Sequence, residues 1–235
     1  MTAERRAELA SNLDEVRARI AAAADAADRD PTELTLIAVT KTYPASDVAL
    51  LAELGITDIG ENRDQEAADK FAQSSALNLR WHFIGQLQRR KCRSVASYAD
   101  VVHSVDRPEL AVALGAAAMA SRRTVDALVQ ISLDVDPRAA RGGVAPSGVM
   151  ALAGQVAATP GLRLAGVMAI APADGDPDPP FRRLAEATAQ VRAAFPDAGI
   201  VSAGMSGDLE AAVKNGATHL RVGTALLGRR TPVVG

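Results

Sequence analysis

The feature that most constrains the fold of this chain is a regular alternation of short apolar runs with segments of helical spacing. Runs of strand length are predicted at 34–41, 57–60, 81–84, 100–104, 124–133, 162–170, 199–202 and 218–222. Helical segments separate them through short connections, which indicates a parallel α/β sheet. Eight strands are the number that closes a (β/α)₈ barrel. The alternative is a doubly wound open sheet, which would favour a glycine-rich turn after the first strand, where this chain has Lys41-Thr42-Tyr43-Pro44.

The whole chain is predicted to form one domain. Its 235 residues suffice for a single barrel, and the composition does not shift along the sequence. We assign 34–228 to the barrel and 1–30 to a leading amphipathic helix. In that helix Leu9, Leu13, Val16 and Ile20 fall on one stripe. The expected class is therefore a single-domain (β/α)₈ TIM barrel with an extra N-terminal helix.

Charge and hydropathy exclude several classes of protein. No apolar run approaches the roughly 18 residues needed to span a bilayer, and the N-terminus leads into a charged helix rather than a signal peptide, so we expect a cytoplasmic protein without membrane contact. A net charge of −2 argues against binding nucleic acid. Cys92 is the lone cysteine, and His82, His103 and His219 lack metal-ligand spacing. We expect no metal site, and each histidine is interpreted as a strand-end residue satisfied by hydrogen bonds.

The first predicted strand ends in a lysine. The run 34–41 is apolar and β-branched up to Lys41, and Pro44 prevents the strand from continuing. One interpretation is a strand-end lysine whose amine reaches water. The other is a desolvated amine whose lowered pKa lets it form a Schiff base with a carbonyl compound.

The loops after the seventh and eighth strands indicate an anion site. Ser206 lies in a stretch of small residues that enters a helix, and Gly223 and Thr224 follow Arg221 at the end of the last strand. Barrels often bind phosphate in these two loops. Taken singly, Ser206 fits a plain helix N-cap and Arg221 an ion-paired strand end. If the barrel closes, a phosphate site and the Lys41 amine share one mouth, which suggests pyridoxal 5′-phosphate as cofactor.

Several short motifs together resemble one known family. They are Ala38-Val39-Thr40-Lys41, Gly60-Glu61-Asn62-Arg63, Trp81-His82-Phe83-Ile84-Gly85, His103-Ser104-Val105-Asp106, Gly204-Met205-Ser206-Gly207-Asp208 and Arg221-Val222-Gly223-Thr224. In this order they are similar to the pyridoxal phosphate homeostasis proteins, single-domain relatives of the N-terminal barrel of bacterial alanine racemases. The chain departs from the family's usual residues at Arg90, where asparagine is usual, and at Ala203, where methionine is common.

The resemblance implies a role for each candidate site residue. It implies that Lys41 carries the Schiff base, that Ser206, Gly223 and Thr224 hold the phosphate, that Arg221 faces the pyridine nitrogen, and that Asn62 and Met168 line the cofactor ring. An arginine keeps that nitrogen unprotonated and weakens the ring as an electron sink. Racemisation also needs a base on each face of the substrate carbon. The racemases, by the same comparison, take their second base from a C-terminal domain that we do not expect beyond Gly235.

The expected function is reversible binding of pyridoxal 5′-phosphate for vitamin B6 homeostasis or delivery to client enzymes, with little or no catalysis and no catalytic residue assigned. A slow amino-acid racemase and a Schiff-base aldolase acting on a phosphorylated substrate remain alternatives. Tyr43 and Asp47 are the local acid–base groups that either enzyme could use. A third alternative is a regulatory module whose basic segment 89–93 docks a client enzyme. We expect a monomer.

Overall fold

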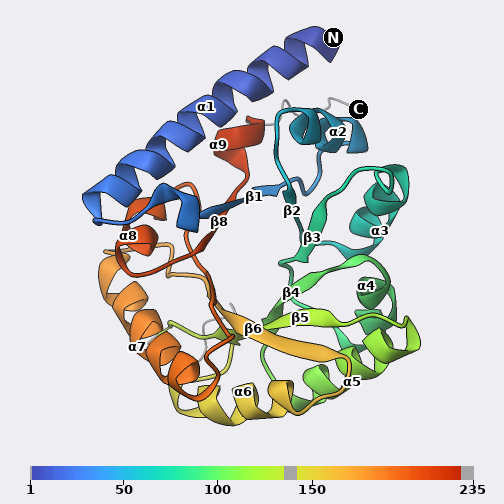
Figure 1. The fold of residues 1–235 in the computed structure, drawn as a ribbon, viewed down its shortest axis with the longest axis vertical. Helices are drawn as coiled ribbons and strands as arrows, with labels where there is room; N and C mark the ends of the chain where they lie inside the picture. Colours follow the sequence, from blue (N-terminus) through green and yellow to red (C-terminus); the bar gives the residue numbers. More distant parts are fainter. Residues whose placement is uncertain (1, 135–141, 229–235) are drawn as a thin grey trace.

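Eight parallel strands form a closed barrel in the computed structural model, which describes residues 2–134 and 142–228. The strands are β1 (Thr35–Val39), β2 (Asp58–Glu61), β3 (Arg80–Phe83), β4 (Val101–Val105), β5 (Val125–Ile131), β6 (Leu162–Ala169), β7 (Ile200–Ser202) and β8 (His219–Val222). Each strand pairs with the next, and β1 pairs with β8 through a register that aligns Ile37 with Arg221 (Figure 1). The predicted barrel is confirmed, and the open sheet is excluded because β1 and β8 are neighbours.

Helices surround the barrel (Figure 1). They are α1 (Thr2–Ala26), α2 (Ala45–Glu53), α3 (Asp64–Gln73), α4 (Cys92–Tyr98), α5 (Pro108–Ala120), α6 (Val149–Ala157), α7 (Asp178–Ala194), α8 (Leu209–Lys214) and α9 (Thr224–Leu227), with short 3₁₀ turns at Pro31–Glu33, Arg89–Lys91 and Pro146–Gly148. Pro108 sits in the first turn of α5, where its missing N–H has no intrahelical acceptor to lose. No helix in the described part of the chain is both long enough and apolar enough to cross a membrane.

The leading helix α1 completes the outer ring. Its buried face includes the predicted stripe of Leu9, Leu13, Val16 and Ile20. The helix after β8, α9, has only 4 residues and leaves a gap that α1 covers by packing against α8 and α9 (Figure 1). Ion pairs hold it at both sides: Arg5 to Asp47 of α2 at 2.6 Å, and Arg19 to Glu210 of α8 at 2.5 Å.

The protein has two apolar cores, one between the strands and the surrounding helices and one inside the barrel. A large cluster fills the layer between strands and helices, and a small one of Val101, Leu128, Ala165 and Met168 lies apart from it. Strand β5 shows the alternation that produces this arrangement, since Ala127 and Val129 belong to the large cluster while Leu128 belongs to the small one. The small cluster fills part of the barrel interior, and polar side chains fill the rest.

Some element boundaries differ from the prediction. The first strand ends at Val39, so Lys41 lies in a turn rather than on the strand. The small residues after the seventh strand predict a helix from Gly207 to Lys214, and α8 begins two residues later, at Leu209. The sequence does not predict α9, because four residues carry no periodic signal. The sequence also predicts a loop rich in Asp, Arg and Gly at 134–143, and most of it falls outside the residues that the structure describes.

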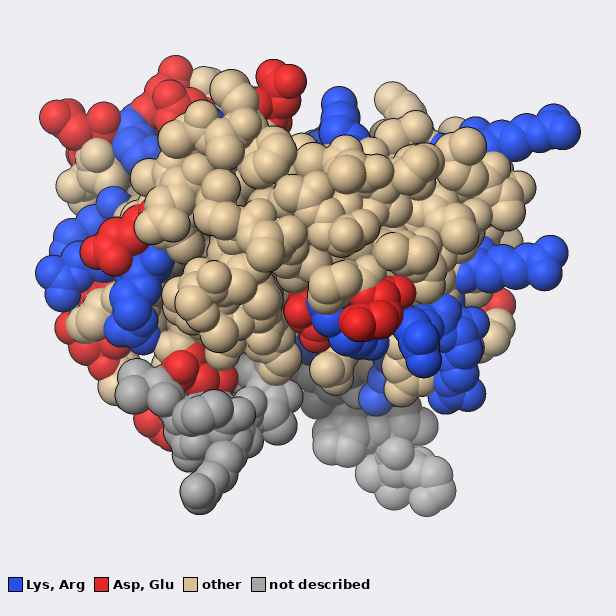
Figure 2. All heavy atoms as spheres, turned by 90° about the horizontal axis from the view of Figure 1, so that it is seen from below, with Lys and Arg blue, Asp and Glu red and all other residues tan. Residues whose placement is uncertain are grey.

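One face of the molecule carries few charges. Figure 2 looks from below onto the side where α5 and α6 lie, and an uncharged band crosses that face between charged margins. Helix α6 contains no ionisable residue, and Val112 and Met119 on α5 are 54% and 57% exposed.

Candidate functional site

All of the candidate site residues lie at the mouth formed by the carboxyl ends of the strands. Met168 and Arg221 are inside β6 and β8 next to their ends, whereas Lys41, Asn62, Ser206, Gly223 and Thr224 follow within four residues of β1, β2, β7 and β8. In (β/α)₈ proteins this mouth carries the chemistry. The closed topology therefore brings residues from distant parts of the chain to one end of the barrel.

Lys41 is an exposed side chain and not a desolvated one. It occupies the turn that follows β1, two residues past the strand's end, and the residue before it, Thr40, is fully buried. Of the two interpretations of Lys41, the exposed side chain agrees with an amine that reaches water, and the desolvated amine is wrong because the residue lies in a turn beyond the strand. Its amine can therefore meet a small molecule that enters from solvent.

The backbone on both sides of Lys41 is held by helix α3. The Lys70 ammonium donates to the Thr40 carbonyl at 2.6 Å, and the Thr42 amide donates to the Glu66 carboxylate. Thr42 has a φ of 70°, a left-handed conformation that a β-branched residue rarely adopts, and the bond to Glu66 stabilises it. The turn is thereby fixed while the side chain of Lys41 stays free.

The group that holds this turn is a buried charge cluster. Lys70 lies 2.7 Å from both Glu61 and Glu66, and the Thr40 hydroxyl donates to Glu61 at 2.6 Å. Burial raises the pKa of Glu61 despite the hydrogen bonds from Lys70 and Thr40. Our sequence interpretation missed Lys70, Glu61 and Glu66 as site residues. The signal that could have found them is the i,i+4 spacing of Glu66 and Lys70 beside the Glu61-Asn62 motif.

Ion pairing distinguishes Lys41 from the other lysines. Lys70 is paired with Glu61 and Glu66, Lys91 with Asp64 at 2.9 Å, and Lys214 with Asp178 at 3.0 Å. Lys41 alone has no carboxylate partner among the described residues. An amine without such a partner loses no ion pair when it reacts.

Lys41 shares a pocket with the loop after β8. The pocket has a volume of about 220 Å³ and is lined by Val39, Lys41, Thr42, Tyr43, Gly223, Thr224 and Gly228. Gly223 packs against Val39 of β1, since a Cβ at Gly223 would stand 3.4 Å from the Val39 carbonyl oxygen, an ordinary van der Waals distance. The first N–H groups of α9 have no acceptor within their own helix. Lys41 and the first residue of α9, Thr224, thus line the same pocket.

Ser206 lies in a neighbouring pocket instead. That pocket measures about 170 Å³ and also contains Arg19, Val222 and Ala225, so the two pockets lie on either side of the start of α9. The Ser206 carbonyl accepts a hydrogen bond from Arg19 at 2.6 Å. The structure brings Ser206 close to the loop after β8 but does not place it in the pocket of Lys41.

Arg221 and Met168 are buried together in the barrel interior. The Arg221 guanidinium donates to the Ser202 hydroxyl at 2.6 Å and to the Ala169 carbonyl at 2.9 Å. Met168 is the register partner of Ser202 and is 1% exposed. Burial lowers the pKa of Arg221 to about 10, with partial opposition from Asp208. At neutral pH the guanidinium therefore remains a buried cation near the mouth.

Asn62 presents a buried oxygen without a partner. Its Oδ1 atom is buried and accepts no hydrogen bond from the described residues. The Asn62 backbone packs so closely on Gly85 that a Cβ there would lie 2.2 Å from the Asn62 carbonyl oxygen. An unsatisfied buried amide oxygen is unfavourable unless a ligand or water pairs with it. The departure at Arg90 lies elsewhere, on an exposed side chain that donates to Gln88 at 2.9 Å.

Comparison with known proteins places the chain in a family. Residues 11–231 match the family model described as the alanine racemase N-terminal domain. The pyridoxal phosphate homeostasis protein of Mycobacterium bovis is 45% identical over 246 residues, which cover 97% of this chain and 95% of that protein. The chain belongs to the pyridoxal phosphate homeostasis protein family. The resemblance indicated by the sequence motifs is thus confirmed.

Two further relatives extend the comparison. The pyridoxal phosphate homeostasis protein of Escherichia coli K12 is 38% identical, over 95% of this chain and 97% of that protein. A solved structure of PipY from Synechococcus elongatus PCC7942, described with PLP bound, superposes with a TM-score of 0.81 at 31% identity and covers 94% of this chain and 100% of that one.

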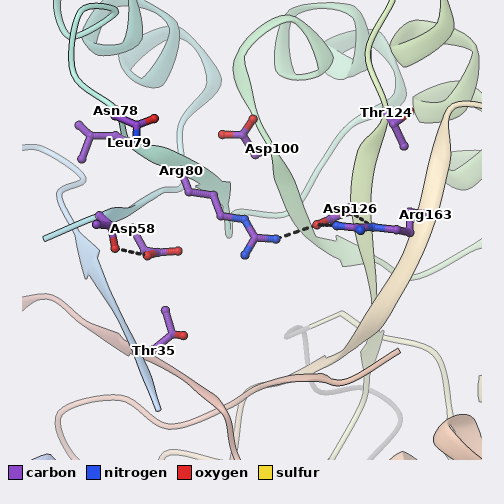
Figure 3. A pocket seen from close by; sticks show the side chains of 10 residues that line it. Thr35, Asp58, Asn78, Leu79, Arg80, Asp100, Thr124, Asp126 and Arg163 are labelled. Carbon is purple, nitrogen blue, oxygen red and sulfur yellow. Dashed lines mark hydrogen bonds and ion pairs between the residues drawn. The ribbon is translucent and has the colours of Figure 1, made fainter. Parts of the chain in front are cut away.

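A larger pocket than that of Lys41 lies at the opposite mouth. It measures about 870 Å³ and is lined by residues from the amino ends of the strands, among them Asp58, Arg80, Asp126 and Arg163. Figure 3 shows Arg80 and Arg163 pointing toward Asp126, to which they donate at 2.7 Å and 2.6 Å. The two arginines of this pocket are thus paired with one carboxylate of the same pocket.

The three histidines meet inside the barrel, which the sequence interpretation did not anticipate. His82 lies 2.9 Å from His103, and the rings of His82 and His219 have centroids 6.3 Å apart. Burial lowers the pKa of all three, that of His103 well below its ordinary value and that of His219 to about 4. No group of side chains in the described residues has the composition of a metal site.

The lowered pKa values of these histidines predict that the folded protein loses stability in mild acid. The folded protein keeps His219 neutral down to about pH 4, whereas the unfolded chain binds a proton near pH 6.5, so stability falls as the pH drops through this window. By pH 5 this one residue accounts for about 2 kcal/mol. We expect His219→Gln to reduce the difference in unfolding free energy between pH 7.5 and pH 5 by that amount, as measured in urea. An unchanged difference would contradict the assignment.

Proposed function

We propose that this protein binds pyridoxal 5′-phosphate reversibly at the carboxyl mouth of its barrel and serves vitamin B6 homeostasis. The observation that carries the proposal is the pocket that Lys41, which has no carboxylate partner among the described residues, shares with Gly223 and Thr224. The cofactor supplies an aldehyde that forms a Schiff base with a lysine amine, and it carries a phosphate that needs N–H and O–H donors. The PLP bound to the related PipY supports the same proposal.

The residues at the mouth fit this cofactor. In our assignment Lys41 binds the aldehyde covalently, and Gly223 and Thr224 hold the phosphate with help from Ser206 across the start of α9. The unpaired Asn62 oxygen and the buried Met168 side chain suit the polar edge and the face of an aromatic ring. The cationic Arg221 suits a ring nitrogen that stays unprotonated, because a guanidinium donates hydrogen bonds and accepts none.

We further propose that the protein has little or no catalytic activity. Besides Lys41, the one titratable side chain lining the described pocket is Tyr43, and its hydroxyl is engaged with the Gly228 carbonyl at 2.7 Å. This contact supports a packing role for Tyr43 at the barrel rim rather than a role as acid or base. A racemase needs a base on each face of the substrate carbon, and an aldolase needs an acid–base group beside the amine. Exchange of the alanine α-proton in deuterated water at about 1 per second or faster would contradict this proposal.

Binding is tested directly with purified protein. Addition of pyridoxal 5′-phosphate should produce a visible absorption band that borohydride bleaches. Peptide mass mapping should then locate the reduced adduct at Lys41. A protein that gains no absorbance would overturn the proposed function, and an adduct elsewhere would overturn the assignment of Lys41.

Thr224→Val tests the phosphate contact. Loss of a hydrogen bond to a charged group costs about 1.5–3 kcal/mol, so affinity for pyridoxal 5′-phosphate should fall by roughly 10- to 100-fold. Thr224→Ser keeps the hydroxyl and should bind nearly as the wild type does. Affinity for pyridoxal, which has no phosphate, should not change in either variant. Equal losses for both ligands would show that Thr224 acts on something other than the phosphate.

The proposal includes a monomeric state and transfer of the cofactor to client enzymes in the cytoplasm. The absence of a membrane-crossing helix among the described residues is compatible with it. Light scattering after size exclusion measures the first point. Transfer to an apoenzyme, followed by recovery of that enzyme's activity, measures the second.

A further inference from the structure

A chain of buried hydrogen bonds crosses the barrel from Arg221 to Asp58. Arg221 Nη1 lies 2.6 Å from Ser202 Oγ, and Ser202 Oγ lies 2.9 Å from His103 Nδ1. His103 Nε2 lies 2.9 Å from His82 Nδ1, and His82 Nε2 lies 2.8 Å from Asp58 Oδ1. These residues come from β8, β7, β4, β3 and β2. Because β4 and β7 are not neighbours in the sheet, their contact crosses the barrel interior.

Each member of this chain is shielded from water. Asp58 is 8% exposed, Arg221 is 4% exposed, and the three residues between them are at most 1% exposed. Hydrogen bonds in such surroundings are electrostatically stronger than in water and polarise one another. Asp58 opens onto the pocket of the amino mouth, so the chain connects the two ends of the barrel (Figure 3).

The ionised carboxylate of Asp58, together with two neutral histidines, determines the direction of every hydrogen bond between Asp58 and Ser202. Arg221 can donate but not accept, so the Ser202 oxygen is the acceptor at that end. The ionised carboxylate of Asp58 can accept but not donate, so His82 Nε2 carries a proton. A neutral His82 then has a bare Nδ1, which requires a proton on His103 Nε2. A neutral His103 has a bare Nδ1, which accepts from the Ser202 hydroxyl.

The charge states that this direction requires are favoured. Burial opposes ionisation of Asp58, but hydrogen bonds from His82 and Thr57 outweigh it, and the pKa of the carboxyl is lowered. Burial lowers the pKa of both His82 and His103, although Asp58 partly opposes the change at His82. If His82 were protonated, the hydrogen bonds from His82 to His103 and from His103 to Ser202 would run in the opposite direction. The lowered pKa of His82 disfavours this protonated form.

We propose that Ser202, His103, His82 and Asp58 form one directed hydrogen-bond relay that positions the guanidinium of Arg221 and couples it to a counter-charge at the opposite barrel mouth. Arg221 contacts no carboxylate among its hydrogen bonds in the described structure, which go to Ser202 and the Ala169 carbonyl. In this relay the carboxylate of Asp58 acts as the counter-charge of Arg221, although the two side chains do not touch. The four are positioning residues, and their relevance to the cofactor ring rests on the function proposed for Arg221.

The wild-type protein without cofactor gives the first test. Nitrogen-15 NMR of labelled histidine distinguishes the two neutral tautomers, which coordinates alone leave to inference. At pH 7.5 we expect both His82 and His103 to be neutral with the proton on Nε2. A proton on Nδ1 of either ring would overturn the relay. This result does not depend on whether pyridoxal 5′-phosphate binds.

Two pairs of variants give the second test, with arginine side-chain NMR as the readout. Ser202→Ala should shift the signals of both Arg221 and His103. Its control is Ser104→Ala, a serine equally buried on β4 whose hydroxyl has no partner among the described residues. Asp58→Asn should also shift the Arg221 signal, although Asp58 does not touch Arg221. Its control is Asp126→Asn, which removes a carboxylate from the same mouth but not from the relay.

The outcomes separate the relay from the proposed function. If Asp58→Asn leaves Arg221 and His103 unchanged, the relay is wrong even when the cofactor binds. If the NMR results hold but no pyridoxal 5′-phosphate binds, the relay stands and the proposed function fails. If both hold, Ser202→Ala should move the visible absorption maximum of the loaded protein, whereas Ser104→Ala should not.

Discussion

Lys41→Arg will abolish the visible absorption band that pyridoxal 5′-phosphate produces with the wild-type protein. Arginine keeps the positive charge and the length of the side chain, but it does not supply a reactive amine. The phosphate contacts at Gly223 and Thr224 remain, so we expect residual binding with affinity lowered about 100-fold, or roughly 3 kcal/mol. Absorbance titration and borohydride reduction followed by mass spectrometry measure the two effects.

The matched control for this variant is Lys214→Arg. Lys214 is a surface lysine paired with Asp178, and an arginine there keeps the charge at a position that lines neither pocket at the carboxyl mouth. It should bind the cofactor as the wild type does. A Lys41→Arg protein that still forms a reducible adduct of the same yield would show that another lysine carries the bond.

Lys70→Met will destabilise the protein by about 3–5 kcal/mol, because removing one partner of a buried ion pair leaves a charge without compensation. The unpaired charge is that of Glu61, which is fully buried and whose pKa burial already raises. Urea unfolding at pH 7.5 measures the loss. Lys214→Met, which breaks an exposed pair, should cost about 1 kcal/mol or less.

A double variant separates the charge from the packing. Lys70→Met combined with Glu61→Gln removes both charges, so it should be more stable than Lys70→Met alone. If the double variant is no more stable, the unpaired Glu61 charge is not the cause. Since Lys70 also holds the Thr40 carbonyl, both variants should form the Lys41 adduct more slowly than the wild type at equal protein concentration.

Much of the fold could be predicted because it depends on local patterns. The alternation of apolar runs and helical segments specified strands and helices to within a few residues, and the number of strands specified closure. A lysine after the first strand and small residues after the seventh and eighth then had to meet at one mouth, because parallel strands in a barrel all end on the same side. This rule allowed the neighbourhood of Lys41, Gly223 and Thr224 to be inferred without coordinates.

Other parts of the site could not be inferred in this way. The exposure of Lys41 depends on where the chain turns after Val39, and strand ends are poorly marked in sequence. The separation of Ser206 from the Lys41 pocket depends on α9, whose four residues are too few to show a period. The hydrogen bond from Lys70 to the Thr40 carbonyl joins residues 30 positions apart in the sequence. No local sequence pattern around Lys70 or Thr40 indicates this bond.

By itself, the sequence determined the class of fold and which loop residues meet at the carboxyl mouth of the barrel, Lys41 among them, because both follow from periodicity along the chain. The tertiary structure alone decided which side chains meet inside the barrel. His103 and Ser202 are 99 positions apart on strands that are not neighbours, and they touch because the closed sheet turns both inward. Contacts across the barrel interior depend on register and curvature, which no local pattern encodes.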